Sequence, residues 1–171
     1  GPAPLLRDHG VNVVHELPGV GENLQDHLQL RTVFKVRNAV TLNQRANSMV
    51  GKMMMGLEYA FLRTGPMTMA PSQLGGFTRS SSEHVTPNIE FHVQPLSLDK
   101  FGDPLHRFPA FTASVCNLRP TSRGFVRIKS PDPLAAPVIQ CRYLSTPEDR
   151  TVAAAALRLT RIETLDGQPV P

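Results

Sequence analysis

Several short segments of this chain alternate apolar and polar residues with a period of two. Between residues 28 and 36, leucine, phenylalanine and valine alternate with glutamine, arginine and lysine, and a similar alternation surrounds Phe91. Successive side chains of a β-strand point to opposite faces, so this period predicts strands with one buried face. Apolar and alternating runs together predict strands at residues 11–14, 28–36, 75–79, 89–94, 111–118, 124–130 and 138–144.

The segment 47–63 carries the strongest helical pattern in the middle of the chain. Its apolar residues recur at spacings of three and four, which places them on one stripe of a helix. Methionines are frequent in this stripe, and flexible methionine side chains fill irregular gaps in cores. We therefore expect the stripe to be buried rather than to form an adaptable surface; it consists of Val50, Met53, Met54, Leu57 and Phe61.

Two further helices are predicted near the ends of the sequence. The first spans the opening residues and ends at Gly10, since glycine readily adopts the left-handed conformation that ends helices. The second begins after Thr146, which can cap its first turn, with Pro147 at the first helical position. Asp149 lies where the acid of a capping box belongs, and the helix is expected to continue to about residue 162.

Predicted strands outnumber predicted helices, and no long alternation of strand and helix occurs. The fold class predicted is therefore α+β, with an antiparallel sheet flanked by helices. The chain has 171 residues, of which 40% are hydrophobic, enough for a sizeable core. Its 16 prolines suit stiff turns between short strands. No segment reaches the roughly 20 apolar residues of a membrane-spanning helix, which predicts no transmembrane segment.

The formal net charge is +4, which raises the question of a nucleic-acid partner. The arginines are scattered and no run of lysine and arginine occurs, so we expect no nucleic acid to bind. Cys116 and Cys141 are the only cysteines and form no CxxC motif. They could form a disulfide, but two buried thiols in a reducing compartment are favoured. Cysteine usage leaves the location open, and a cytoplasmic one is slightly favoured.

A few polar motifs are candidates for chemistry. Gly19-Val20-Gly21 could approach a phosphate, but no third glycine follows at the spacing of the dinucleotide fingerprint, so a turn is favoured. Asp26-His27 could orient an imidazole for proton transfer or cap a turn, and the residues leave both open. His92 lies on the polar side of its predicted strand, where a surface role is the simpler interpretation.

Two long segments of the sequence resemble the glucose–methanol–choline (GMC) family of oxidoreductases. Residues 17–27 read LPGVGENLQDH, and residues 119–133 read RPTSRGFVRIKSPDP. Shorter matches include GGF at residues 75–77, NIEFH at 88–92, and PVI and YLS at 137–139 and 143–145. The resemblance covers nearly the whole chain, and the choline dehydrogenase branch is the most similar.

This resemblance implies a function. The family oxidises alcohols to aldehydes by hydride transfer to FAD, with a histidine as base. Residues 1–27 would be the tail of the FAD-binding domain, and residues 28–171 a substrate-binding domain that is incomplete at its C-terminal end. The implied partners are a small alcohol and the flavin domain. The implied site residues are Asn23, Asp26 and His27 near the flavin, and Gln73, Phe91, His92 and Gln94 toward the substrate.

The sequence also departs from the family pattern. The GxGxxG nucleotide fingerprint would precede Gly1, and the catalytic histidine would follow the last helix, where residues 164–171 fit no family motif. We therefore expect no catalytic residue in this chain and no activity of the chain alone. Gln73 stands where choline-type members carry glutamate, which favours a neutral alcohol over a quaternary ammonium substrate. The alternatives are a stand-alone small-molecule binding module and an inactive truncated product.

Overall fold

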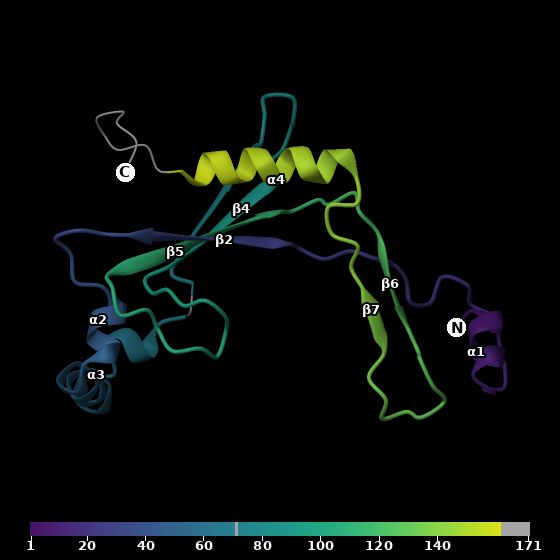
Figure 1. Ribbon diagram of the computed structural model, residues 1–171, viewed down its shortest axis with the longest axis horizontal. Coiled ribbons are helices and arrows are strands. Elements are labelled where there is room, and N and C mark those ends of the chain that lie inside the picture. The colour runs from purple at the N-terminus through teal and green to yellow at the C-terminus, as the bar shows by residue number, and fades with distance from the viewer. Residues whose placement is uncertain (71, 162–171) are drawn as a thin grey trace. The chain divides into compact units, whose positions relative to one another are not determined.

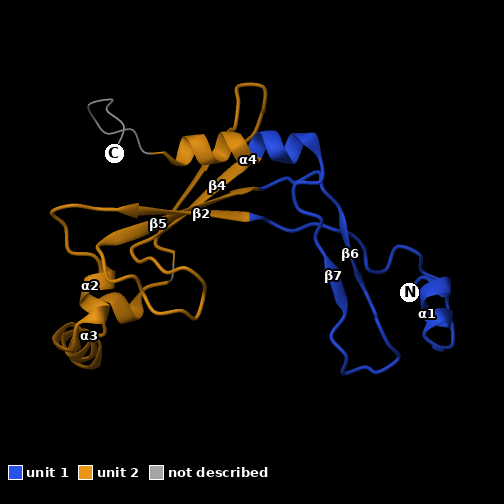
Figure 2. Ribbon diagram, viewed as in Figure 1, with its two compact units in different colours: residues 1–28, 118–152 blue, residues 29–117, 153–171 orange. Residues whose placement is uncertain are grey.

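The computed structural model describes residues 1–70 and 72–161, and these divide into two compact units (Figure 2). Unit 1 contains residues 1–28 and 118–152, and unit 2 contains residues 29–117 together with the chain from Ala153 onward. Both units contain antiparallel sheets with helices, so the predicted α+β class is confirmed. The end of the last predicted helix and the tail at 164–171 lie outside the described residues.

Unit 2 is built on a four-stranded antiparallel sheet with the strand order β2-β5-β4-β3 (Figure 1). Apolar and alternating runs predicted all four strands to within one residue at each end. Their bounds are β2 Gln29–Lys35, β3 Leu74–Thr78, β4 Ile89–Gln94 and β5 Ala110–Asn117.

One face of this sheet is apolar. The register pairs Phe34 with Phe111, and Phe91 with Val115, so these side chains share a face. The rings of Phe34 and Phe111 stack with their centroids 5.2 Å apart, and Val115 is fully buried. The apolar face therefore contributes Ile89, Ala113 and Val115 to the buried core of unit 2.

Two helices follow β2 in unit 2, α2 (Leu42–Asn47) and α3 (Met49–Leu62), and a short 3-10 turn (Pro66–Thr68) follows them. Thr41 and Gln44 form a capping box at the start of α2, so local hydrogen bonds set where this helix begins. At the C-terminal end of α3, Arg63 adopts the left-handed conformation that ends the helix.

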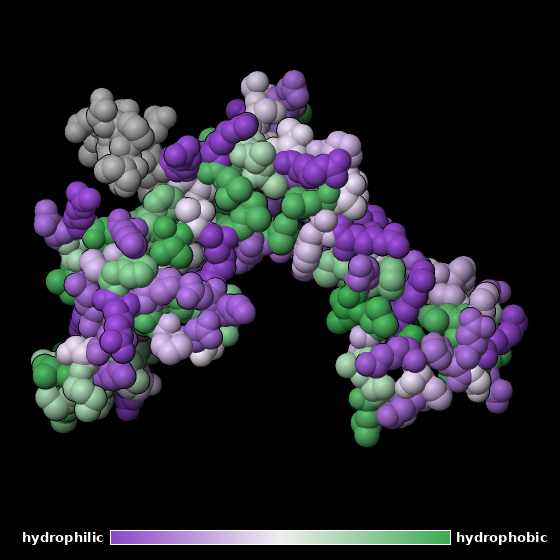
Figure 3. Space-filling model, in the orientation of Figure 1, coloured by the Kyte–Doolittle hydropathy of each residue, from purple (hydrophilic) through white to green (hydrophobic). Residues whose placement is uncertain are grey.

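The predicted burial of the α3 stripe is wrong. Val50, Met53, Met54, Leu57 and Phe61 are between 45% and 80% exposed, and apolar surface gathers in the region of α3 in Figure 3.

The helix instead uses its other side for packing. A side chain at Gly51 would collide with the carbonyl of Arg45 in α2, Met55 is buried, and Glu58 lies 3.5 Å from the Arg45 guanidinium. Packing against α2 therefore needs the small residue at Gly51, and this turns the methionine-rich side outward.

Unit 1 contains a three-stranded antiparallel sheet in the order β1-β6-β7, the short helix α1 (Ala3–Asp8) and the start of α4 (Pro147–Thr160). The strands are β1 (Glu22–Leu24), β6 (Gly124–Arg127) and β7 (Val138–Gln140). The strand β1 lies in a segment whose turn residues predicted only a loop.

Two glycines let the strands of unit 1 approach closely. Gly21 has a φ of 80° and accepts a hydrogen bond of 2.6 Å from the amide of Val126, and a side chain there would strike the Val126 carbonyl. A side chain at Gly124 would strike the backbone carbonyl of Gln140. The glycine motif at residues 19–21 thus ends in a turn that leads into β1, as the sequence favoured.

The predicted buried strand at residues 11–14 is wrong. The structure has no strand there, and Val14 is 98% exposed. This segment lies between α1 and the turn before β1, and the strand that pairs with β6 begins only at Glu22. Its three valines have a high β-strand propensity, but a segment without a neighbouring strand does not form a sheet.

The start of α4 is fixed by a polar cluster. The hydroxyl of Thr146 accepts a hydrogen bond of 3.2 Å from the Asp149 amide, so the predicted cap is confirmed. The Asp149 carboxylate accepts bonds of 2.8 and 2.9 Å from the amides of Thr121 and Ser122. Burial alone would raise the pKa of this carboxyl, but these hydrogen bonds lower it below its usual value.

None of the helices in the described part of the chain is long and apolar enough to cross a membrane.

Candidate functional site

The second face of the four-stranded sheet carries polar side chains. The register places Arg31 of β2 opposite Ser114 of β5, and Ser114 opposite His92 of β4, so the three form one row across the sheet. The neighbouring row pairs Thr112 with Gln94. Cross-strand partners point to the same side, and we call the side that carries these five residues the polar face.

Several buried atoms of the polar face lack a partner. Ser114 and Gln94 are 1% and 6% exposed. The Oγ of Ser114, the Oε1 of Gln94, and the Nε and Nη2 of Arg31 are buried and have no hydrogen-bond partner among the described residues. Buried polar atoms are nearly always satisfied in folded proteins, so a group of unpartnered ones on one face needs an explanation.

The segment 95–109, which connects β4 to β5, covers part of the polar face. The hydroxyl of Thr112 donates a hydrogen bond of 2.8 Å to the carbonyl of Leu96. The ring of Phe101 lies with its centroid 4.7 Å from the Arg31 guanidinium carbon, within cation–π range. These two contacts join the connection to β5 and β2 on the polar face.

A second, more exposed group lies where β4 and β5 pair Glu90 with Cys116. The Nε2 of His92 is 3.3 Å from one carboxylate oxygen of Glu90, and the Cys116 sulfur is 3.9 Å from the other. Burial, and after it the charge of Glu90, raise the pKa of the Cys116 thiol to about 11. This thiol therefore stays protonated at neutral pH and is a weak nucleophile. Cys116 and Cys141 are both free thiols.

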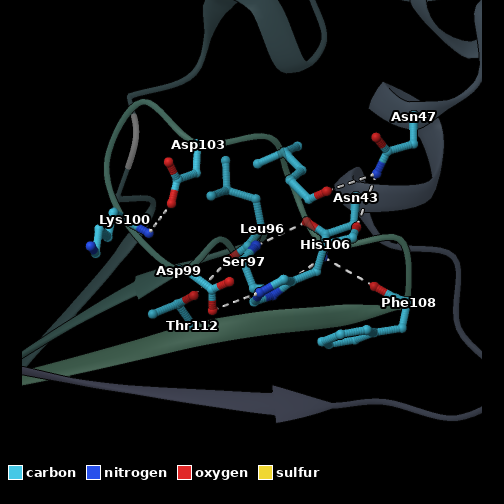
Figure 4. A network of polar contacts seen from close by, with 11 residues as sticks. Asn43, Asn47, Leu96, Ser97, Asp99, Lys100, Asp103, His106, Phe108 and Thr112 are labelled. Carbon is cyan, nitrogen blue, oxygen red and sulfur yellow. Dashed lines mark hydrogen bonds and ion pairs between the residues drawn. The ribbon is translucent and has the colours of Figure 1, made fainter.

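A chain of serine, histidine and aspartate lies in the covering segment (Figure 4). The Nδ1 of His106 is 3.0 Å from the Ser97 hydroxyl, and its Nε2 is 3.2 Å from Asp99. The order resembles a nucleophilic triad, but Ser97 has no exposed surface and its hydroxyl accepts a bond of 2.8 Å from Asn43 of α2. The network fastens the covering segment to α2 and offers no accessible nucleophile.

The residues expected near a flavin lie in unit 1 and are exposed. Asn23 has a φ of 62° at an irregularity in the pairing of β1 with β6, and such bulges redirect side chains away from the ladder. His27 donates its Nε2–H to the carbonyl of Leu118 at 3.1 Å, because a carbonyl can only accept. This bond leaves the Nδ1 of a neutral His27 as an acceptor.

Asp26 has a structural partner in the same unit. Its carboxylate accepts a hydrogen bond from the Tyr143 hydroxyl, and the sulfur of Cys141 lies 3.9 Å away. The bond to Asp26 is the main reason why the pKa of Tyr143 is raised well above its usual value. Asp26 thus links the segment before β2 to the residues after β7.

The residues expected near a substrate do not all share one face. His92 and Gln94 lie on the polar face, and Gln73 comes just before β3, where its amide donates a bond of 3.0 Å to the carbonyl of Val93. Gln73 is exposed. Phe91 alternates with His92 along β4, so it lies on the apolar face, away from His92 and Gln94.

Sequence reasoning did not single out Arg31 and Ser114. Arg31 was one of several scattered arginines, and Ser114 lies in a strand whose other residues are mostly apolar. Only the pairing of β2, β5 and β4 shows that they lie in one row with His92. The alternation around residue 31 indicates the polar side of a strand, but nothing local identifies its neighbours.

Together these features define the class of this chain: an α+β chain with a partly covered polar sheet face and a second, glycine-dependent sheet. Residues 120–165 match the family model described as GMC oxidoreductase. This segment therefore carries the GMC oxidoreductase pattern, and most of the chain is similar to curated alcohol and choline dehydrogenases.

Two curated relatives illustrate this similarity. An alcohol dehydrogenase [acceptor] of Pseudomonas putida is 38% identical over 162 residues, which are 94% of this chain and 29% of that protein. An oxygen-dependent choline dehydrogenase of Acinetobacter baumannii is 38% identical over 161 residues, again 94% of this chain and 29% of that protein. The chain therefore spans less than a third of the length of these relatives.

Solved structures agree on the fold. A formate oxidase superimposes with a TM-score of 0.81 at 20% sequence identity, over 94% of this chain and 32% of that one. At this identity the likeness concerns the arrangement of helices and strands alone.

Proposed function

We propose that this chain is the substrate-binding portion of an FAD-dependent alcohol oxidoreductase. In this reaction the CH–OH group of a primary alcohol loses a hydride to the flavin and a proton to a base, which leaves an aldehyde and reduced FAD. The polar face carries the proposal, because it places His92 and Gln94 side by side with unpartnered hydrogen-bonding atoms.

Two residues of unit 1 fit the edge of an isoalloxazine ring. This ring offers both an N–H donor and carbonyl acceptors. A neutral His27 would offer its Nδ1 as an acceptor because its other nitrogen donates to Leu118, and the exposed amide of Asn23 can both donate and accept. Asp26 would act indirectly, since it is engaged with Tyr143. FAD, when bound, would supply the hydride acceptor.

The substrate side favours an alcohol without positive charge. Gln73, at the start of β3, is a neutral amide, and Arg31 brings a positive charge to the polar face. Gln73 offers no opposite charge to a desolvated quaternary ammonium group, and the Glu90 carboxylate on this face is already engaged with His92 and Cys116. Choline is therefore not the proposed substrate, although it appears in the names of relatives.

The two proposed domains would have different roles, FAD binding and substrate binding. Residues 1–27 would belong to the FAD-binding domain and residues 28–171 to the substrate-binding domain. In the structure, residues 118–152 fold with the N-terminal segment because β6 pairs with β1. This pairing would tie the two functions together through backbone hydrogen bonds. The catalytic base would come from a part of the family fold that this chain does not supply.

The proposal predicts different behaviour for this chain and for the whole protein as its gene encodes it. We expect the whole protein to purify with stoichiometric yellow flavin that is bleached by primary alcohols in the absence of an acceptor. The 171-residue chain alone should bind no flavin tightly and turn over nothing.

Two outcomes would contradict the proposal. One is alcohol-dependent bleaching of a stoichiometric flavin in the isolated chain. The other is a whole protein that binds hydrophobic alcohols, measured as a rise in Tm, but contains no flavin; this would favour a binding module without redox chemistry. The reading frame around this segment is a further check, since a GxGxxG upstream and a histidine-containing segment downstream are expected.

A further inference from the structure

Arg31 is the most unusual residue of the polar face. Its Nε and Nη2 are both buried, and no described residue accepts a hydrogen bond from either. These two nitrogens form one edge of the planar guanidinium, the edge that meets a carboxylate with two parallel hydrogen bonds. A buried charge is normally paired, so this edge has the geometry and the need for an anionic partner.

Three described acidic residues of unit 2 lie on or above the polar face, and none of them is this anionic partner. The two oxygens of Glu90 face His92 and Cys116. Asp99 bonds to His106, and Asp103 accepts from the amide of Lys100. Each of these three carboxylates is therefore engaged elsewhere.

The neighbours of Arg31 have hydrogen-bonding capacity to spare. Ser114 is its direct partner in the register, and the buried Ser114 hydroxyl has no described partner. Gln94, one row away on β4, bonds through Nε2 to Ser72 at 3.3 Å and leaves its buried Oε1 without a described partner. A hydroxyl donor and an amide acceptor thus accompany the guanidinium edge on one face.

We propose that Arg31 and Ser114 form a carboxylate-binding site on the polar face. The guanidinium edge donates two hydrogen bonds to the carboxylate, and the Ser114 hydroxyl donates a third. The unpartnered oxygen of Gln94 suits a hydroxyl group on the same ligand. The binding site does not depend on the proposed function. If that function holds, the site implies that the substrate is an alcohol bearing a carboxylate, so this consequence rests on the proposed function.

Binding is tested with propionate on the whole protein, with propionamide as the neutral molecule of the same shape. Isothermal titration calorimetry should give a Kd for propionate at least about tenfold lower than for propionamide, as expected for charge-assisted hydrogen bonds. Equal affinities for the two molecules would overturn the site.

Variants assign the binding to Arg31. Arg31→Gln should raise the propionate Kd at least about tenfold. Arg31→Lys should restore only part of the affinity, because an ammonium lacks the two-pronged edge. Arg79→Gln is the matched control, since it removes an equal charge from an exposed arginine that bonds to the His84 carbonyl. It should leave the Kd unchanged.

If Arg31→Gln does not fold, Arg31→Lys and Ser114→Ala decide the question. Ser114→Ala removes one neutral donor and should raise the propionate Kd several-fold. Wild-type affinity in both folded variants, or an equal loss in Arg79→Gln, would overturn the site.

The substrate class is tested separately with glycolate and the neutral ethylene glycol. The whole protein should oxidise glycolate with the higher kcat/KM, and Arg31→Gln should lower the ratio of the two kcat/KM values at least about tenfold. Propionate binding without flavin or turnover would refute the proposed function and leave the site standing. Alcohol oxidation without propionate binding would refute the site and leave the proposed function unaffected.

Discussion

The two compact units are stabilised in different ways. Among the buried hydrophobic residues that the structure describes, only Ala3 and Val152 belong to unit 1. Unit 2 buries residues from each of its two central strands, including Ile89 and Val115. Unit 1 depends instead on close backbone pairing at Gly124 and on the hydrogen bonds of Asp149.

The pattern of apolar and polar residues predicted strands in both units, whereas the two long family-like segments both lie in unit 1. A sheet with an apolar face needs only hydrophobic residues at alternate positions, so periodicity predicts it and many sequences satisfy it. A sheet held by close approach and by one buried carboxylate needs particular residues at particular positions. The long family-like segments contain Gly21, Ser122 and Gly124, which have these structural tasks in unit 1.

The largest effect is expected where unit 1 has no room. Gly124→Ala places a methyl group against the backbone of Gln140 and Cys141, which cannot rotate away. We expect a loss of about 3 kcal/mol in the free energy of unfolding, at the upper end for an overpacked site. Urea denaturation measures it, and hydrogen exchange should show faster exchange in β6 and β7.

Gly76→Ala in β3 is the matched control in unit 2, because a methyl group there meets nothing within 4 Å. It should change the stability by less than about 1 kcal/mol, and in the stabilising direction. Equal losses for the two glycines would remove the contrast between the units.

A smaller effect is expected at Asp149. Asp149→Ala leaves the amides of Thr121 and Ser122 without their acceptor, at a cost of about 2 kcal/mol at neutral pH. Asp149→Asn keeps the shape and one acceptor oxygen, so it should lose less. Denaturation in urea gives both values, and faster exchange of the two amides would locate the damage.

The contribution of Asp149 should depend on pH. The folded-state pKa of this carboxyl is lowered, so its stabilisation is present above the unfolded-state pKa of about 3.9 and is lost as the pH falls through the folded-state value. The stability difference between wild type and Asp149→Asn should therefore be constant above about pH 5 and shrink below pH 4. A difference that grows in acid would contradict the assignment.

The sequence predicted most of the strands but few of the contacts between them. Apolar and alternating runs located the strands of unit 2, and alternation was clear in β2 and β4, whose two faces have different environments. This pattern placed a strand at residues 11–14, where valines have no partner, and missed β1, whose pairing depends on Gly21 and a bulge at Asn23. These features depend on residues about a hundred positions away in β6, which local patterns do not report.

The candidate site divides in the same way. The family resemblance implied His92 and Gln94 as site residues, and alternation puts both on the polar side of one strand. Alternation also separates Phe91 from them. Arg31 and Ser114 come from two other strands, so only the register reveals that they share a row with His92.

A moderate effect is expected in the apolar core of unit 2. Ile89 is fully buried in β4, and Ile89→Val removes one methylene group, at a cost of about 1 kcal/mol. Val14→Ala, in the segment wrongly predicted as a buried strand, should cost less than about 0.5 kcal/mol because Val14 is exposed. Urea denaturation of the two variants separates them, and equal losses would restore the strand at residues 11–14.

The smallest effect is expected on the outward stripe of α3. Met54→Ala should change the free energy of unfolding by less than about 0.5 kcal/mol, because Met54 is 54% exposed and alanine is an excellent helix former. The adjacent Met55→Ala is the matched control. Met55 is 8% exposed, so its truncation should cost about 2 kcal/mol or more. A large loss at Met54 in urea denaturation would mean that the stripe is buried in the folded protein after all, as its helical spacing first suggested. A large loss confined to Met55 would instead establish that α3 stabilises unit 2 through the side that carries Gly51.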